Sequence, residues 1–236
     1  MSVTSRVERV NTRDGDFNAY VALPESGSGP GIVVLQEIFG VGGYIKEATE
    51  RLAGIGYVAL APDLYWRIKP GIAVDHTEEG MGEAFQTAQQ LDHGLAVSDS
   101  IDALKALREL PEVTAGKAGV LGFCLGGTLA FEVAIEADPE TAVCYYGSGI
   151  PGMLDRAKEI RCTVLFHFGG QDPYIPREQA EDVCAFARTQ SNMECHLHLD
   201  AGHAFDNHEA PMFHQPEPAA VAWGQTSNFL ARTLPT

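Results

Sequence analysis

Short apolar runs alternate with longer segments of helical periodicity along most of the chain, and this alternation constrains the fold more than any other feature. Residues 32–36 form a continuous apolar run, which is typical of a strand buried on both faces of a parallel sheet. Further strands are expected at residues 57–61, 117–123, 141–146, 163–168 and 194–199. Helices are expected at 44–55, 82–110 (one helix broken near Gly94, or two), 125–137, 177–189 and 219–230. The pattern predicts a mainly parallel central sheet with helices on both faces.

The N-terminal segment has a different pattern. Apolar and polar residues alternate over residues 7–23 around the pair Asp14-Gly15, and glycine accepts the positive φ of a tight two-residue turn. We therefore expect an antiparallel hairpin ahead of the parallel strands. A chain of 236 residues can bury roughly 70–75% of its unfolded surface in one core. One domain over residues 1–236 is expected, with long irregular segments at 65–80 and 206–218.

Composition and charge exclude several classes of partner. Acidic residues outnumber basic ones by 32 to 16, and the net charge is −16. Because no cluster of Lys and Arg offers a surface for phosphates, nucleic acid is not an expected partner. No apolar run reaches the roughly 20 residues of a membrane span, and no signal peptide is recognisable, so a cytoplasmic protein without a membrane partner is expected. The negative field favours a neutral small-molecule substrate. The sequence carries no signal for an oligomeric state.

Cysteine usage suggests a reducing compartment. The chain has five cysteines, Cys124, Cys144, Cys162, Cys184 and Cys195. Their odd number and their spacing match neither a disulfide framework nor a metal-binding CxxC pair. All five are therefore expected to be free thiols.

Residues 117–130, KAGVLGFCLGGTLA, carry the most specific chemical signal. An apolar strand runs into Gly122-Phe123-Cys124-Leu125-Gly126 and then into an Ala/Leu helix. This is the pattern of a nucleophile elbow, with cysteine in the central position and glycines that permit a sharp turn. The helix N-terminus behind Cys124 favours a thiolate. The alternative is a small buried cysteine at an ordinary strand-helix junction.

A cysteine nucleophile needs a base and an orienting acid, and the chain offers both downstream. Asp172 follows the apolar run 163–168 and a GGQ turn, and His203 follows the run 194–199 and a DAG turn. The chain order nucleophile, acid, histidine is that of α/β-hydrolases. Each residue lies just past a strand end, where open α/β sheets gather catalytic groups. An exposed turn carboxylate and a histidine without a catalytic role are the alternatives.

Six motifs in order resemble the dienelactone hydrolase (carboxymethylenebutenolidase) family of the α/β-hydrolase superfamily over nearly the whole chain. They are QEIFG at 36–40, APDLY at 61–65, GFCLGG at 122–127, YYG at 145–147, GGQD at 169–172 and AGH at 201–203. The resemblance implies that Cys124, Asp172 and His203 form a catalytic triad. It also implies that Glu37 contacts the resting thiol and that the backbone amides of Ile38 and Leu125 form an oxyanion hole.

Glu37 also has an interpretation from its own position. A carboxylate at the end of a buried strand next to the elbow can hold a thiol neutral or compete with His203 for its proton. The alternative is a surface carboxylate that caps the turn at residues 40–43.

The sequence differs from the family in the residues that bind the substrate carboxylate. Family members that act on dienelactone hold that group with two arginines, one before the central long helix and one after the catalytic histidine. Here residues 75–85 contain no Arg or Lys, and AFDNH follows His203. Without a bidentate partner, a buried carboxylate loses an interaction of roughly 2–5 kcal/mol. Neutral esters or lactones are therefore the expected substrates, with Arg67 as a possible substitute cation.

The remaining candidates concern the pocket, metals and cofactors. Four aromatic residues lie next to motif residues, namely Phe39, Trp66, Tyr145 and Phe205. They could line an apolar substrate pocket or belong to the core. His196 and His198 share a strand face, but no third ligand at metal spacing follows, so no metal is expected. No nucleotide-binding motif occurs, so no cofactor is expected.

These observations together predict a cysteine-dependent hydrolase of neutral esters or lactones that works through a thioester acyl-enzyme. One alternative is attack of the same thiol on neutral phosphotriesters. The other is a non-catalytic binding protein on the same fold.

Overall fold

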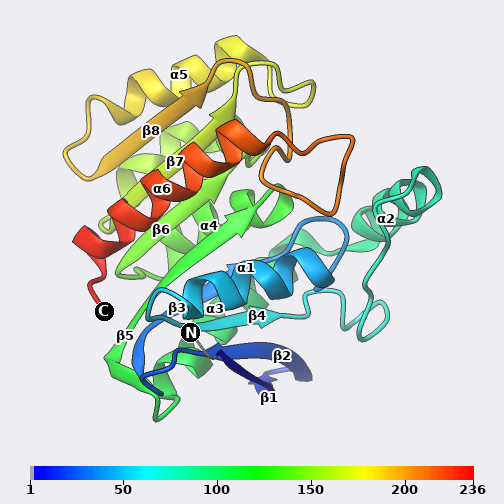
Figure 1. The fold of residues 1–236 in the computed structure, drawn as a ribbon, viewed down its shortest axis with the longest axis vertical. Helices are drawn as coiled ribbons and strands as arrows, with labels where there is room; N and C mark the ends of the chain where they lie inside the picture. Colours follow the sequence, from blue (N-terminus) through cyan, green and yellow to red (C-terminus); the bar gives the residue numbers. More distant parts are fainter. Residues whose placement is uncertain (1–2) are drawn as a thin grey trace. The chain divides into compact units, whose positions relative to one another are not determined.

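The computed structural model describes residues 3–236 (Figure 1). The strands follow the order β1-β2-β4-β3-β5-β6-β7-β8. The pairs β3/β4, β6/β7 and β7/β8 are parallel, which confirms the mainly parallel sheet. The chain divides into two compact units, one ending at Val120 and including Thr236, the other comprising Leu121–Pro235. The expectation of a single domain stays a prediction.

Within residues 3–120, the first unit contains four complete strands and three helices. The strands are β1 (Thr4–Thr12), β2 (Gly15–Leu23), β3 (Gly29–Leu35) and β4 (Val58–Pro62), and the helices are α1 (Gly43–Ala53), α2 (Glu78–Gln90) and α3 (His93–Glu109). Strand β5 (Val113–Phe123) begins here. The expected helical region 82–110 is two helices, because Asp92 caps α3 by accepting a hydrogen bond from the Leu95 amide at 3.0 Å.

The expected antiparallel hairpin is present, but its turn lies one residue earlier than predicted. Thr12 pairs with Gly15, so Arg13 and Asp14 are the two loop residues. Gly15 itself is part of the ladder with φ of +152°, and a Cβ there would lie 3.1 Å from the Trp66 ring. A glycine is needed at position 15 because of its backbone conformation and because the Trp66 indole leaves little room for a side chain, not because it lies at the centre of the turn.

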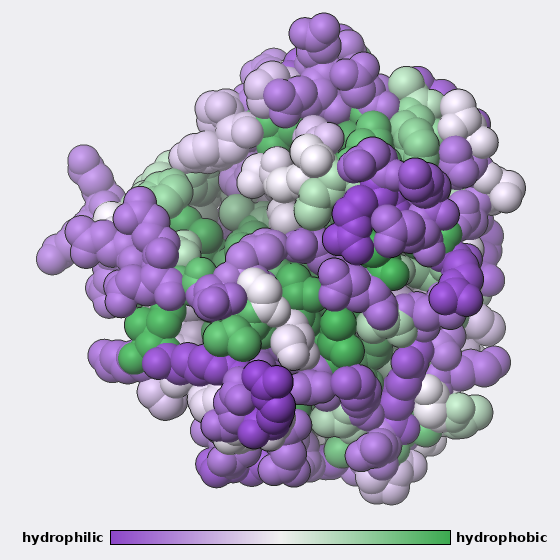
Figure 2. Space-filling model, turned by 180° about the vertical axis from the view of Figure 1, so that it is seen from behind, coloured by the Kyte–Doolittle hydropathy of each residue, from purple (hydrophilic) through white to green (hydrophobic). Residues whose placement is uncertain are grey.

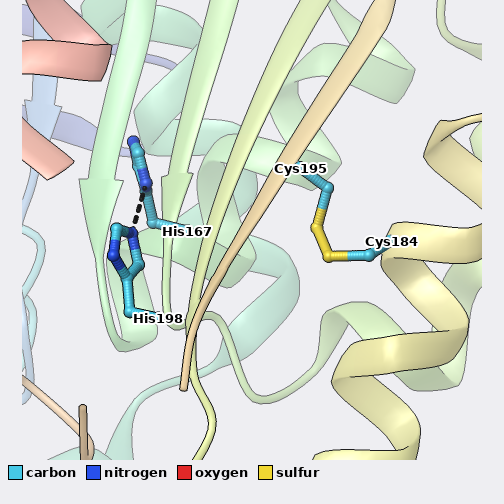
Figure 3. Close-up of a disulfide and its surroundings, with 4 residues drawn as sticks. All are labelled: His167, Cys184, Cys195 and His198. Atoms are coloured by element: carbon cyan, nitrogen blue, oxygen red, sulfur yellow. Dashed lines mark hydrogen bonds between the residues drawn. A yellow bond between two sulfur atoms is a disulfide. The ribbon is translucent and has the colours of Figure 1, made fainter. Parts of the chain in front are cut away.

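The second unit holds the end of β5 and three parallel strands, β6 (Thr141–Tyr145), β7 (Thr163–Gly169) and β8 (Met193–His198). Its helices are α4 (Leu125–Glu136), α5 (Arg177–Ala187) and α6 (Pro216–Thr233), with a 3-10 segment, η1 (Ile150–Glu159). Helix α4 packs on β6, α5 packs on β7 and β8, and α6 packs on β6 and β7. In Figure 3, α5 lies on one side of these strands and the side chains of His167 and His198 on the other. The α/β-hydrolase architecture expected from the sequence is thereby confirmed.

Hydrophilic side chains cover most of the face shown in Figure 2, with smaller apolar areas between them. Within residues 3–236, no helix combines the length and apolar character needed to cross a bilayer.

Candidate active site

Cys124 lies on a sharp turn between β5 and α4. Its backbone has φ of +54° and ψ of −113°, a conformation that side-chain-bearing residues rarely adopt. A Cβ on Gly122 would lie 1.9 Å from the Gly126 carbonyl oxygen, and one on Gly127 would lie 2.3 Å from the Tyr145 carbonyl oxygen. Only glycine permits these approaches, so the local sequence brings strand and helix together at Cys124. The predicted elbow geometry is thus present in the backbone.

Cys124, His203 and Asp172 form a hydrogen-bonded chain inside the second unit. Nε2 of His203 lies 3.1 Å from the Cys124 sulfur, and its Nδ1 lies 2.7 Å from Oδ2 of Asp172. The other carboxylate oxygen accepts hydrogen bonds from the amides of Tyr174 at 2.8 Å and Ile175 at 3.2 Å. His203 and Asp172 are buried, whereas Cys124 is partly exposed. The arrangement can orient an imidazole against a sulfur that solutes can reach.

The charges and hydrogen bonds around His203 favour a protonated, positively charged imidazole. Burial alone lowers the pKa of His203, but the negative charge on the Cys124 sulfur and the hydrogen bond to Asp172 outweigh it and raise the pKa to about 10. Next to a negatively charged sulfur, the His203 imidazole is therefore protonated near neutral pH.

The loop that carries His203 is held closely against the end of β7. A Cβ on Gly169 would lie 2.4 Å from the Gly202 carbonyl oxygen, so the two segments touch through backbone. The Gly202 amide donates to Oε1 of Gln215 at 2.7 Å. Ala204 has φ of +52°, an uncommon conformation directly after the histidine. These contacts place the imidazole independently of any substrate.

The model of the dienelactone hydrolase family matches residues 17–234. The chain belongs to the dienelactone hydrolase family. A putative carboxymethylenebutenolidase of Azospirillum brasilense is 34% identical over 223 residues, which cover 94% of this chain and 95% of that protein. The carboxymethylenebutenolidase of Pseudomonas putida is 37% identical over 198 residues, which cover 83% of this chain and 84% of that protein.

Solved structures agree on the fold. A dienelactone hydrolase-like promiscuous phosphotriesterase from metagenomic libraries superimposes with a TM-score of 0.81 at 24% identity, covering 99% of this chain and 100% of that chain. A putative dienelactone hydrolase from Klebsiella pneumoniae superimposes with a TM-score of 0.80 at 22% identity, covering 98% of this chain and 99% of that chain. This member of the dienelactone hydrolase family is therefore a hydrolase with the α/β-hydrolase fold.

The segment with Glu37 and Ile38 is rigidly held in the first unit of this dienelactone hydrolase family member. Glu37 is buried. The Ile38 carbonyl accepts from the Tyr65 hydroxyl at 2.9 Å, and the Phe39 carbonyl accepts from the Val74 amide at 2.9 Å. Among residues 3–236, the Ile38 amide has no hydrogen-bond acceptor. A fixed peptide with an unused donor is what an oxyanion hole requires, and the assignment of Glu37 and Ile38 stays a prediction.

Leu125 supplies the second amide that the resemblance assigned to the oxyanion hole. It is the first residue of α4, where backbone amides have no partner within the helix. In the described part of the chain its amide donates to no carbonyl. Its role likewise stays a prediction.

The four aromatic residues proposed for the pocket lie in packed surroundings. Tyr145 and Phe205 have no exposed surface, and Phe39 is 5% exposed. Trp66 contacts Phe17 and donates its indole N–H to Asp99 at 2.8 Å. Tyr145 and Phe205 therefore belong to the core rather than to a surface that a substrate can contact. A position next to a motif residue in the sequence does not determine the direction in which a side chain points.

One aromatic residue beside the imidazole was missed by the sequence interpretation. The Tyr174 ring meets the His203 ring edge to face, with centroids 4.9 Å apart and planes at 74°. Tyr174 is 48% exposed. The buried Tyr146 ring also contacts His203, at 5.2 Å. The signal available in the sequence was an aromatic residue two positions after the candidate acid.

A second group of histidines lies on the α6 side of the sheet. His167 Nδ1 and His198 Nε2 are 3.1 Å apart (Figure 3), and the rings of His167 and His196 stack at 5.6 Å. His167 Nε2 lies 3.0 Å from the Thr226 hydroxyl oxygen. Burial lowers the pKa of His167 well below its usual value and that of His198 to about 4, with a further contribution from His196. His167 and His198 are therefore neutral hydrogen-bonding groups near neutral pH.

The expectation of five free thiols is wrong for two of them. Cys184 on α5 and Cys195 on β8 form a disulfide, with Cα atoms 5.1 Å apart (Figure 3). Packing of α5 on β8 brings the two residues together, a contact that their spacing of 11 residues does not reveal. Cys124, Cys144 and Cys162 are free. A disulfide is typical of oxidising compartments, so it argues against the reducing compartment inferred from the cysteine count.

Proposed function

We propose that this protein is a cysteine-dependent hydrolase of neutral esters or lactones that works through a thioester acyl-enzyme. The observation that carries the proposal is the hydrogen-bonded chain from Asp172 through His203 to Cys124, with separations of 2.7 and 3.1 Å. A carboxylate, an imidazole and a sulfur in this order have the geometry of an activated nucleophile.

Acylation starts from a thiolate–imidazolium pair, in which the raised pKa of His203 keeps the proton on the ring. The Cys124 sulfur attacks the carbonyl carbon and forms a C–S bond, and the carbonyl π electrons move to oxygen. When this intermediate collapses, the bond to the leaving oxygen breaks and His203 Nε2 donates its proton to that oxygen. The products of this step are a thioester, a neutral imidazole and the alcohol, or the free hydroxyl end of an opened lactone.

Deacylation reverses the roles. The neutral His203 takes a proton from water, and the hydroxide attacks the thioester carbon. Collapse breaks the C–S bond, releases the acid and restores the thiolate–imidazolium pair. Asp172 keeps Nδ1 protonated throughout and stabilises the positive charge on the ring. In this proposal the Leu125 amide donates to the oxyanion in both steps, and the roles that the family resemblance gives to the Ile38 amide and to Glu37 stay predictions.

The charges in the first unit support a neutral substrate. Arg67, the one cation considered as a substitute carboxylate partner, forms ion pairs with Asp99 and Asp14. Its guanidinium also lies 4.2 Å above the Trp66 ring. An arginine engaged in this way is not free to bind a substrate carboxylate, and the net charge of −16 repels anions on approach.

A substrate panel tests the proposal. It contains phenyl acetate, a neutral lactone, 4-carboxyphenyl acetate and diethyl aryl phosphate, each with wild type and Cys124→Ala. We expect turnover of the neutral ester and lactone, a lower kcat/KM for the carboxylate analogue, and a loss of at least ~10³-fold in Cys124→Ala. Turnover that survives in a folded Cys124→Ala protein contradicts the proposal. The phosphate tests the phosphotriester alternative, and absence of any turnover favours a binding protein.

A further inference from the structure

The exposed aromatic residue next to the catalytic pair has no role in the steps above. Tyr174 is the second residue after Asp172 and precedes α5. Large apolar side chains that stay half exposed at a site commonly contact a ligand, because their burial by that ligand is favourable. Within residues 3–236, the Tyr174 hydroxyl has no hydrogen-bond partner.

The position of the ring is fixed through the triad itself. The Tyr174 amide donates to Oδ1 of Asp172 at 2.8 Å, and the next residue, Ile175, donates to the same oxygen and is buried. The backbone on both sides of the ring is therefore held by the carboxylate that orients His203. A ring placed in this way presents the same surface to each incoming substrate, at little cost in ordering.

The chemistry of the reaction indicates which part of the substrate meets this ring. His203 Nε2 must come within hydrogen-bond distance of the leaving oxygen to protonate it. The group attached to that oxygen then lies beside the imidazole, and the Tyr174 ring is 4.9 Å from the imidazole centroid. The acyl group, in contrast, is bonded to the Cys124 sulfur.

We propose that Tyr174 is a specificity-determining residue that packs against the leaving group, and that this site therefore prefers esters of aromatic alcohols over esters of small alkyl alcohols. This inference rests on the proposed function, because it needs His203 to act as the proton donor. It deepens that function by assigning the alcohol side of the substrate to one side chain.

The test uses two acetate esters that give the same acetyl-enzyme, 2-naphthyl acetate and ethyl acetate. In Tyr174→Ala, kcat/KM for the naphthyl ester should fall at least about 10-fold, whereas kcat/KM for the ethyl ester should change less than about 2-fold. The deacetylation rate constant, measured after an acylation burst, should equal that of wild type because the leaving group has departed. Tyr174→Phe should retain the naphthyl preference, and Val221→Ala, an exposed apolar position on α6, serves as the control.

The outcomes separate this inference from its alternatives. Equal losses for both esters together with slower deacetylation would show that Tyr174 only positions His203, and unchanged kinetics for both esters would show that the ring contacts no leaving group. Either result overturns the inference. If Tyr174→Ala does not fold, Tyr174→Leu gives the same comparison without the ring. Failure of the proposed function itself would be seen differently, as the absence of an acetyl-enzyme burst or as activity that survives in Cys124→Ala.

Discussion

Asp172 accepts the Nδ1 hydrogen of His203 on one carboxylate oxygen and two backbone amides on the other. This division leaves each oxygen with a defined partner, so the carboxylate cannot rotate without breaking several hydrogen bonds. The imidazole is consequently held with Nε2 toward the Cys124 sulfur at 3.1 Å. Asp172 thus orients the ring, and the backbone contacts of the His203 loop fix its position.

Replacing Asp172 with Asn tests this relationship. The amide retains the volume, but its NH₂ group competes with the Nδ1 hydrogen and favours the wrong imidazole tautomer. We expect kcat to fall by about 10²–10⁴-fold with the fold intact, by analogy with the known effect in serine protease triads. Steady-state kinetics with phenyl acetate and circular dichroism are the measurements. Asp182→Asn, on the exposed side of α5, is the matched control, and an equally active Asp172→Asn protein would contradict the assignment.

The free thiols should differ in reactivity toward iodoacetamide. Cys124 is partly exposed and hydrogen-bonded to His203, whereas burial raises the pKa of Cys144 and raises that of Cys162 to about 12. Because the thiolate is the nucleophile, Cys124 should be alkylated first, and activity should fall in proportion. Peptide mass mapping after partial labelling measures this. Inactivation that follows labelling of Cys144 or Cys162 would argue against Cys124 as the nucleophile.

The Cys184–Cys195 disulfide should stabilise the second unit. It closes a short loop between α5 and β8, which corresponds to about 3 kcal/mol in the chain-entropy model. Reduction with a thiol reagent should therefore lower the thermal midpoint by roughly 5–10 °C. The Cys184→Ala/Cys195→Ala variant should start at the lower midpoint and show no response to the reagent, whereas Cys162→Ala should respond like wild type. A midpoint that does not move on verified reduction would show that the bond adds no stability.

His167 and His198, whose pKa values are lowered, should make the protein sensitive to acid. His198 has a folded pKa of about 4, and burial also lowers the pKa of His167 well below its usual value, so the unfolded chain binds protons below about pH 6.5 that the folded chain does not. This contribution to stability is present above pH 6.5 and is lost as the pH falls toward 4. Urea unfolding at pH 7 and pH 4.5 should show a smaller free energy at pH 4.5, and His198→Gln should reduce the difference. An equal difference in His198→Gln would contradict this explanation.

Local chemistry made much of the site predictable from the sequence. The glycines around Cys124 and the turns before Asp172 and His203 encode their positions at strand ends, and the chain order nucleophile, acid, histidine connects the three residues. The expected hairpin, the parallel strands and the break before α3 likewise follow from short-range patterns. Features that depend on packing between distant segments were not accessible. The disulfide depends on how α5 meets β8, and the burial of Tyr145 and Phe205 depends on neighbours from several strands.

The central claim is that a covalent thioester forms on Cys124, and intact-mass spectrometry of a rapidly quenched reaction tests it most directly. With 2-naphthyl acetate, wild-type protein should gain the mass of one acetyl group within the burst, and peptide mapping should locate that group on Cys124. Cys124→Ala should gain no acetyl group under the same conditions. Full turnover without any acetyl adduct, or an adduct on a residue other than Cys124, would contradict the proposed mechanism.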